Sequence, residues 1–301
     1  MKFVVTGGLG FIGSYIVKHL LSQDHQVIVV DNFWRGRLEN LSGFEEKIDL
    51  QKLDILDFDS LKEIISDLDG IFHQAALTSA PESFIQKEKY HSVNVDGTEN
   101  IFKLAKEFGI KVVYASSSSV YGNTTLIPIK EDFDKKPINP YGITKLEDEK
   151  LAEKYHNLGV SIIGLRYFNV YGIGQTNDYA GVITKFYDCI KANKPPIIFG
   201  DGSQIRDFVS VEDVAKANLL SMQSNTDFAF LNIGTGIKTS VKELAYLMIR
   251  LSGKSLKPDF DELPQGDVKE SQADVSLAKK MINWSYETSL EDGLKNSFSI
   301  K

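Results

Sequence analysis

The chain has 301 residues, which is enough for two lobes around a substantial core. Its composition, 42% hydrophobic and 25% charged, is ordinary for a globular protein, and its net charge of -7 argues against a nucleic-acid or anionic-membrane partner, because both favour a basic surface. With one cysteine, Cys189, and no apolar run of the roughly 18 residues that span a membrane, we expect a cytoplasmic protein without an internal disulfide or a metal site.

The first half of the chain alternates short apolar runs with amphipathic stretches. The predicted strands cover 3–5, 27–30, 49–53, 70–73, 111–115 and 160–165, and the predicted helices cover 11–21, 61–68, 93–108 and 141–157. Continuous apolar strands that alternate with helices are typical of parallel βαβ units with both sheet faces covered. The sequence therefore predicts an α/β fold with a doubly wound parallel sheet.

The alternation of strands and helices breaks after about Arg166. Segments 195–196, 200–202 and 258–266 carry the glycines and prolines of loops, whereas 211–222 and 241–251 are predicted as helices. The sequence contains neither a low-complexity segment nor a Pro/Ser-rich linker, so we expect a smaller C-terminal lobe that packs tightly against the first.

A glycine-rich segment, residues 6–13, lies between the first predicted strand and the first predicted helix. There Gly7 allows a tight turn, Gly10 lets the backbone approach phosphates, and Gly13 lets helix and strand pack closely. The helix N-terminus adds free N–H groups. The second strand ends in Asp31, whose carboxylate would accept from both ribose hydroxyls of NAD and repel the 2′-phosphate of NADP. This order predicts a Rossmann-type fold with bound NAD. Arg35 and Arg37, close to Asp31 in the chain, would instead suit NADP.

Two further motifs indicate catalysis. Tyr141 and Lys145 have the i, i+4 spacing that places them on one face of a helix. An ammonium and the positive nicotinamide ring would both favour the phenolate form, which acts as a base. The serine run 116–119 follows a predicted strand, where open α/β sheets bind ligands. A solvated helix face and a polar loop are the non-catalytic interpretations of these two motifs.

Taken together, the chain resembles the extended short-chain dehydrogenase/reductase family and, within it, the nucleotide-sugar 4-epimerases. The matching segments are 6–13, 31–32, 54–55, 73–77, 94–98, 116–122, 141–145, 166–172, 199–202, 206–209 and 232–236. The resemblance implies an NAD-binding Rossmann domain over 1–165, with a return segment near 208–235, and a mainly substrate-binding lobe over 166–301. It also implies a homodimer formed by the helices that begin near Val93 and Tyr141.

The resemblance assigns roles to individual residues. Tyr141 would be the catalytic base, Lys145 would tune it and hold the nicotinamide ribose, and Ser117 would hydrogen-bond the reacting hydroxyl. The implied cofactor contacts are Gly7, Gly10, Phe11, Ile12, Gly13, Asp31, Asn32, Asp54, Ile55, Ala75, Ala76, Thr78, Asn94, Tyr141, Lys145 and Phe168. The implied substrate contacts are Ser117, Asn169, Val182, Ile197, Phe199, Arg206, Asp267 and Ser271.

Two positions bear on the type of reaction. Ser118 and Ser119 stand where related 4,6-dehydratases carry an Asp-Glu pair and where decarboxylating relatives carry a Glu, so we expect plain 4-epimerisation. Ser271 stands at a position that, in the family that the chain resembles, is small where an N-acetyl group must fit. The resemblance therefore implies UDP-N-acetylglucosamine as the substrate, with UDP-glucose as a second candidate. Pro264 stands where the family often carries an Arg that contacts phosphate, so either Arg206 would carry more of the diphosphate charge or another cation would compensate. A dehydratase, a reductase and a non-catalytic NAD sensor are the alternatives.

Two other groups of polar residues are interpreted as structural. His73 ends a buried strand, so we expect a structural histidine and not a base. The acid-rich segment 147–150 is interpreted as a solvated face of its helix.

Overall fold

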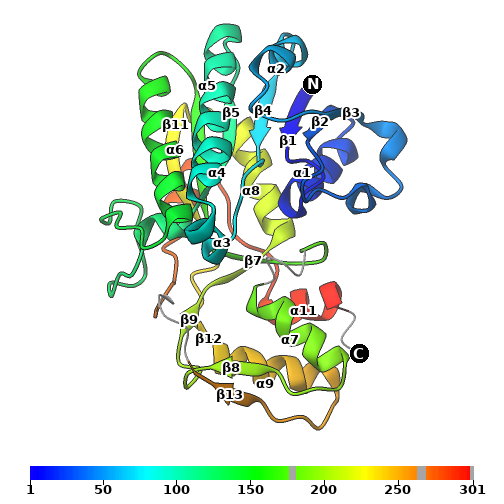
Figure 1. Cartoon of the computed structure of the whole chain (residues 1–301), viewed down its shortest axis with the longest axis vertical. Helices are drawn as coiled ribbons and strands as arrows, with labels where there is room; N and C mark the ends of the chain where they lie inside the picture. The colour runs from blue at the N-terminus through cyan, green and yellow to red at the C-terminus, as the bar shows by residue number, and fades with distance from the viewer. Residues whose placement is uncertain (176–180, 263–268, 299–301) are drawn as a thin grey trace.

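The computed structural model describes residues 1–175, 181–262 and 269–298. Its main layer is a parallel sheet of seven strands in the order β11-β6-β5-β4-β1-β2-β3 (Figure 1). The bounds are β1 Lys2–Thr6, β2 Gln26–Asp31, β3 Asp49–Lys52, β4 Gly70–His73, β5 Val112–Ser117, β6 Ile162–Tyr167 and β11 Phe228–Ile233. Because the strand order changes direction at β1, a ligand crevice is expected beyond the carboxyl ends of β1 and β4.

Both faces of this sheet are covered, as the apolar strands predict. Successive residues of a strand point to opposite faces. On β1, Phe3 and Val5 belong to an apolar cluster with α1 (Phe11–Ser22) and α8 (Val211–Gln223). Val4 belongs to a second cluster on the opposite face. That face is covered by α2 Phe58–Ile65, α5 Gly97–Phe108 and α6 Pro140–His156. The predicted doubly wound α/β fold is therefore confirmed.

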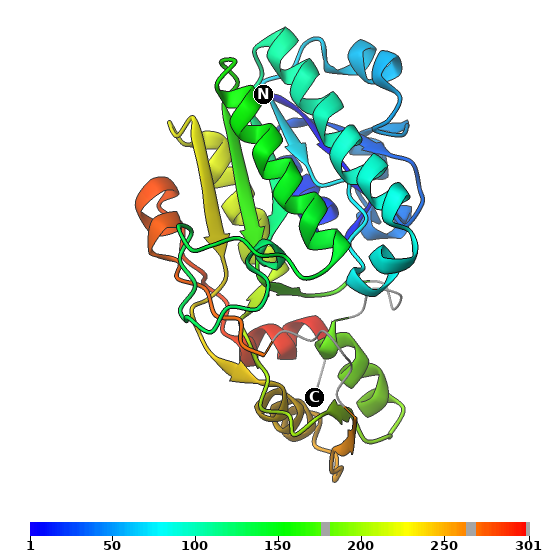
Figure 2. The same cartoon turned by 60° about the vertical axis from the view of Figure 1, so that its left-hand side comes forward.

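A smaller lobe lies beyond the carboxyl ends of the strands, which point toward it (Figure 2). Its apolar core joins α7 (Val182–Lys191), α9 (Val241–Ser252) and α11 (Leu290–Phe298). Three short strand pairs complete it or connect it to the main sheet: parallel β7 Asn169–Tyr171 with β10 Phe208–Ser210, parallel β8 Ile197–Phe199 with β13 Asp259–Asp261, and antiparallel β9 Ile205–Arg206 with β12 Thr239–Ser240. The crevice therefore has a wall from each lobe.

The structure corrects two of the predicted elements. The predicted loop 258–266 contains β13, because Asp259 N donates to Pro196 O and Asp261 O accepts from Gly200 N. The predicted helix 93–108 begins with a π-helical turn, Ser92–Asp96, before α5. The sequence did not predict α7, α11 or the shorter helices α3 Ala80–Ile85, α4 Lys87–His91 and α10 Ser276–Ile282. Short 3-10 turns cover Leu38–Leu41, Glu45–Lys47 and Ser118–Tyr121. No helix of the described residues is long and apolar enough to cross a membrane.

Candidate active site

Two adjoining cavities, of about 510 and about 370 Å³, lie at the carboxyl ends of the central strands. Both are lined by Gly7, Gly10, Arg35, Gln74 and Ala76, so together they form one continuous trough. The predicted residues that line the larger cavity are Gly7, Gly10, Phe11, Ile12, Gly13, Ala76, Thr78, Ser117, Tyr141, Lys145 and Phe168. The smaller cavity is lined by the predicted residues Asp31, Asn32, Asp54, Ile55, Ala75 and Ala76. The predicted contacts of a dinucleotide are thus divided between the two parts of this trough.

The glycine-rich segment forms a backbone cradle at the start of α1. Gly7 has a φ of +66°, and a Cβ on it would lie 2.7 Å from the backbone nitrogen of Ala75. A Cβ on Gly13 would lie 2.2 Å from the carbonyl oxygen of Gly7. Among the described residues no side chain caps α1 at Gly10. The exposed N–H groups of this helix end therefore remain available to phosphate oxygens, as NAD requires.

Asp31 lies at the end of β2 and lines the smaller cavity. Its carboxylate accepts hydrogen bonds from the backbone N–H groups of Leu9, at 3.1 Å, and Phe33, at 2.9 Å. Burial raises the pKa of Asp31, and these two backbone donors oppose that shift. A Cβ on Gly36 would lie 2.5 Å from the same carboxylate, so the glycine leaves room around it. Asp31 is thus an oriented acceptor that suits the hydroxyls of a ribose.

The rest of the smaller cavity also suits an adenosine. Asn32 donates to the carboxylate of Asp54 at 2.8 Å, which fixes two polar groups beside the apolar side chain of Ile55. Arg35 follows Asp31 in the chain and donates to both carboxylate oxygens of Glu82, at 3.1 and 3.0 Å. Since this arginine is engaged with an acid of α3, its presence near Asp31 is no argument for NADP. The residues present therefore fit NAD.

Tyr141 occupies the second position of α6, where the sequence strongly favours a helix start. Asn139 caps the helix by accepting from the N–H of Gly142 at 2.7 Å, and Pro140 occupies the first position. The N–H of Tyr141 donates to Ser83 Oγ of α3 at 3.1 Å. These contacts hold the start of α6, and with it the phenol, against the larger cavity.

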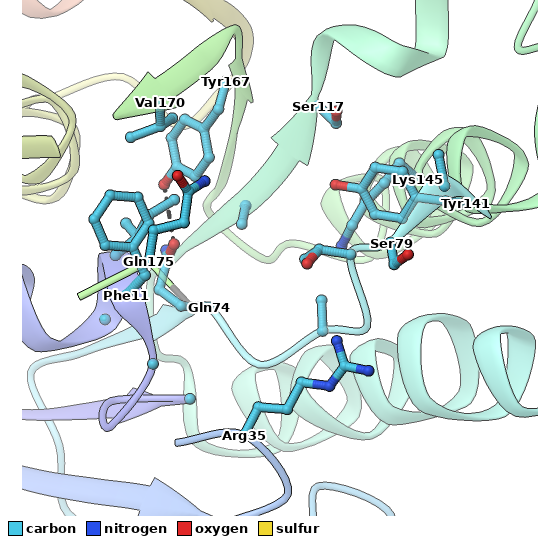
Figure 3. Close-up of a pocket in the computed structure, with 18 of the residues that line it drawn as sticks. Phe11, Arg35, Gln74, Ser79, Ser117, Tyr141, Lys145, Tyr167, Val170 and Gln175 are labelled. Atoms are coloured by element: carbon cyan, nitrogen blue, oxygen red, sulfur yellow. Dashed lines mark hydrogen bonds between the residues drawn. The ribbon is translucent and has the colours of Figure 1, made fainter. Parts of the chain in front are cut away.

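Lys145 and Ser117 line the same cavity as Tyr141 (Figure 3). Lys145 is only 3% exposed, and its Nζ lies 3.1 Å from Oδ2 of Asp148. Ser117 ends β5, donates to Ser119 Oγ at 3.1 Å and accepts from the Ser119 N–H at 3.1 Å. The fold thus brings together a phenol, an ammonium and a hydroxyl, as predicted. A phenol beside an ammonium can exchange a proton with a substrate hydroxyl.

The interpretation of 147–150 as a solvated helix face is wrong for its two central residues. Glu149 accepts from Ser116 Oγ at 2.7 Å and forms a bidentate ion pair with Arg166, with both N···O distances at 2.8 Å. Asp148 is completely buried. These two positions lie on the face of α6 that packs against β5 and β6, and each acid has a buried cation as its partner.

Two predicted residues support the site without lining it. Asn94, fully buried, binds both the N–H and the C=O of Leu77 and donates to Thr144 Oγ1, so it ties the segment after β4 to α6. His73 hydrogen-bonds Thr6 Oγ1 at 2.7 Å and Thr98 Oγ1 at 2.9 Å. Burial lowers the pKa of His73 to about 3, which leaves a neutral imidazole. This is the structural role that the sequence predicts for His73.

The structure does not bring the predicted substrate contacts of the smaller lobe into either cavity. Asn169 begins β7 and donates to the carbonyl of Asp207 at 3.2 Å, and the Ser271 N–H donates to the carbonyl of Ile205 at 3.1 Å. Val182 begins α7, Ile197 and Phe199 lie on β8, and Arg206 ends β9. Asp267 and Pro264 lie outside the described residues. The roles of these residues stay predictions.

The smaller lobe contributes other residues to the larger cavity, which the sequence did not single out. Val170, Gly174, Gln175 and Lys185 line it, and Gln175 accepts from Thr184 Oγ1 of α7 at 2.8 Å. Val170 and Gln175 lie across the cavity from Tyr141 and Lys145 (Figure 3). Lys185 is three residues after the predicted contact at the start of α7, one helical turn along the chain, and this spacing is the only signal that could have found it.

Comparisons with known proteins agree with this geometry. Residues 3–234 match the model of the NAD dependent epimerase/dehydratase family. The putative UDP-glucose 4-epimerase of Methanocaldococcus jannaschii is 38% identical over 97% of this chain and 95% of its own length. The UDP-glucuronate 4-epimerase of Thermodesulfobacterium geofontis is 35% identical, with 98% and 94% covered. A solved UDP-N-acetylglucosamine 4-epimerase from Methanobrevibacter ruminantium M1, in complex with UDP-N-acetylmuramic acid, superposes with a TM-score of 0.95 at 35% identity, covering 99% of this chain and 97% of that one.

The family model covers well over half of the chain, the relatives are similar along nearly their whole lengths, and the trough fits the cofactor. The chain belongs to the NAD dependent epimerase/dehydratase family, it is an NAD-dependent enzyme, and at the level of the family its relatives support UDP-sugar 4-epimerase activity.

Proposed function

We propose that this protein is a UDP-sugar 4-epimerase that interconverts UDP-N-acetylglucosamine and UDP-N-acetylgalactosamine, with UDP-glucose and UDP-galactose as a second pair. The observation that carries the proposal is the convergence of Ser117, Tyr141 and Lys145 on one cavity that continues into a dinucleotide trough. A cofactor that is reduced and reoxidised within one cycle suits an isomerase, because no net oxidation occurs.

In this mechanism the residues of the chain transfer one proton, from the 4-hydroxyl of the sugar and back to the same oxygen. Bound NAD would supply a hydride acceptor and then a hydride donor at carbon 4 of the sugar. Tyr141, as phenolate, takes the proton of the 4-hydroxyl, Lys145 stabilises the phenolate charge, and Ser117 hydrogen-bonds the reacting oxygen. After the 4-keto sugar has turned, Tyr141 returns the proton to the oxygen. Gly7, Gly10 and Gly13 would hold the pyrophosphate, and Asp31 would hold the adenosine ribose.

The serine run supports epimerisation over elimination or decarboxylation. Ser118 and Ser119 follow β5 in a 3-10 turn, and Ser119 is engaged with Ser117. Serine hydroxyl groups lack the acid and base strength that removal of water across carbons 5 and 6 demands. These serines therefore favour proton transfer at the 4-hydroxyl over those two reactions in the proposal.

The choice of sugar rests on two features. Ser271 is a small side chain at the position that the resemblance assigns to the substrate, and a small residue leaves room for an N-acetyl group. The similar structure from Methanobrevibacter ruminantium M1 carries the name of a UDP-N-acetylglucosamine 4-epimerase. We also propose a cytoplasmic location and a homodimer formed through α5 and α6, which lie side by side on the outside of the sheet (Figures 1 and 2).

Proton NMR of the purified protein with each UDP-sugar tests this proposal. UDP-N-acetylglucosamine, UDP-glucose and UDP-glucuronate are incubated separately, first without and then with added NAD. Appearance of the galacto form, fastest with the N-acetylated sugar, is the expected result. Faster turnover of UDP-glucuronate would overturn the choice of sugar, and three unchanged spectra with NAD present would overturn the proposed 4-epimerase activity.

A further inference from the structure

A buried acid, Asp148, forms an ion pair with Lys145, one of the two residues of α6 proposed for proton transfer. Asp148 is three residues after Lys145 on α6, is 0% exposed, and places Oδ2 3.1 Å from Nζ of Lys145, which is itself 3% exposed. A buried charge is costly unless an opposite charge accompanies it. Asp148 and Lys145 therefore act as one another's counter-ions, and a lysine that lines the active cavity is tied to a carboxylate outside it.

The other charged groups around this pair are engaged elsewhere. Arg166 of β6 is held by Glu149, so Lys145 is the only cation paired with Asp148 among the described residues. The titratable neighbours are Glu147 and Glu149 on α6, Tyr114 on β5, His73 on β4 next to Lys145, and His91 of α4 next to Glu147. The π-helical turn contributes Asn94, which binds Thr144, and the buried face of α5 is apolar apart from Thr98.

The geometry has a direct consequence for Tyr141. An ammonium has three N–H donors, and Asp148 accepts one of them. A carboxylate at that distance also offsets part of the positive charge that Lys145 presents to the cavity. We propose that Asp148 is a positioning residue that orients Lys145, moderates its charge toward Tyr141, and thereby sets the pH range over which Tyr141 serves as a base. This inference rests on the proposed role of Tyr141.

Asp148 also carries the means to respond to pH. Burial raises the pKa of Asp148 to about 7, against the opposing effect of the Lys145 ammonium. Its second oxygen, Oδ1, has no hydrogen-bond partner among the described residues and is free to accept a proton. When Asp148 gains that proton, Lys145 presents its full charge to Tyr141, and the phenolate is favoured. Asp148 and Tyr141 are therefore coupled, and the two groups should titrate together over a wider pH range than one group would.

The test compares Asp148→Asn with Glu153→Gln, a matched control that removes one negative charge from an exposed position of the same helix. Phenolate formation at Tyr141 is read without substrate, as the ultraviolet difference between each protein and the same protein carrying Tyr141→Phe. In Asp148→Asn the ionisation of Tyr141 should occur at a pH lower by about one unit and follow a single titration, because a charge close to the ammonium is gone. The acid limb of the kcat profile should move in the same direction, with KM changed by less than about two-fold.

An ionisation of Tyr141 that is the same in Asp148→Asn as in Glu153→Gln would overturn the inference. Retained NAD and thermal melting establish that each variant is folded. If the asparagine variant does not fold, Asp148→Ser, which also removes the charge and is smaller, is titrated in its place. A shifted titration in a protein that turns over no sugar would uphold the role of Asp148 and contradict the proposed function. Turnover of a sugar with an unshifted titration would uphold the proposed function and contradict the role of Asp148.

Discussion

Replacing Glu149 by glutamine leaves the guanidinium of Arg166 buried without its counter-ion. Arg166 is 1% exposed, its Nε and Nη2 each donate to one carboxylate oxygen of Glu149 at 2.8 Å, and Ser116 donates to the same carboxylate. Removal of one partner from a buried ion pair costs about 3–5 kcal/mol, and a glutamine oxygen keeps one of the hydrogen bonds. We therefore expect Glu149→Gln to lower the free energy of unfolding by about 3 kcal/mol.

Urea unfolding followed by circular dichroism, with NAD held at one concentration, measures this loss. Glu153→Gln, on an exposed position of α6, should change the free energy of unfolding by less than about 0.5 kcal/mol. The double variant Glu149→Met with Arg166→Met should be more stable than Glu149→Gln alone, because no buried charge is left unpaired. A loss below about 1 kcal/mol in Glu149→Gln would refute the reasoning that this ion pair anchors the end of β6 to α6.

Three further predictions follow from the site. Tyr141→Phe should lower kcat by about 10²–10⁴-fold and keep the bound NAD, since only the proton-transferring group is lost; undiminished turnover by NMR would show that Tyr141 is not the base. Gly13→Ala should yield protein without NAD by absorbance, because its Cβ would lie 2.2 Å from the carbonyl of Gly7; normal NAD content would contradict the backbone cradle. The pKa of His73 is lowered from 6.5 to about 3, so the unfolded chain binds one more proton between these pH values, and this residue's contribution to stability is lost as the pH falls below 6.5, by about 1.4 kcal/mol per pH unit. His73→Gln should show a shallower fall of the urea midpoint with acidity, and an unchanged slope would contradict a neutral buried imidazole.

The parts of the fold that depend on local chemistry were predictable from sequence. The glycines after β1 and the acid at the end of β2 carry the cofactor prediction, because tight turns and close backbone approach require specific residues at specific places. Ser117, Tyr141 and Lys145 come from β5 and α6, whose ends meet at one edge of a parallel sheet. A correct strand order along the chain is enough to bring such residues together.

What the sequence did not predict depends on partners that are distant in the chain. Glu149 looks like a solvated acid until Arg166, on a different element, is placed beside it. Asp148 has its partner Lys145 on the same helix, and it is buried because α6 packs against β5 and β6. The strand β13 is short and exposed and exists only because it pairs with β8. Lys185 enters the cavity through the packing of α7, which the apolar pattern of the smaller lobe did not indicate. Tertiary contacts decide each of these features, and local propensity does not.

The measurement that tests the central claim most directly uses UDP-N-acetylglucosamine with deuterium at carbon 4, in ordinary water. Transfer of hydride away from that carbon and back to its other face predicts that the UDP-N-acetylgalactosamine product keeps deuterium at carbon 4, as read by proton NMR and mass spectrometry. Product with protium at carbon 4 would mean that the hydrogen exchanges with water, which would contradict a hydride that returns to the carbon it left.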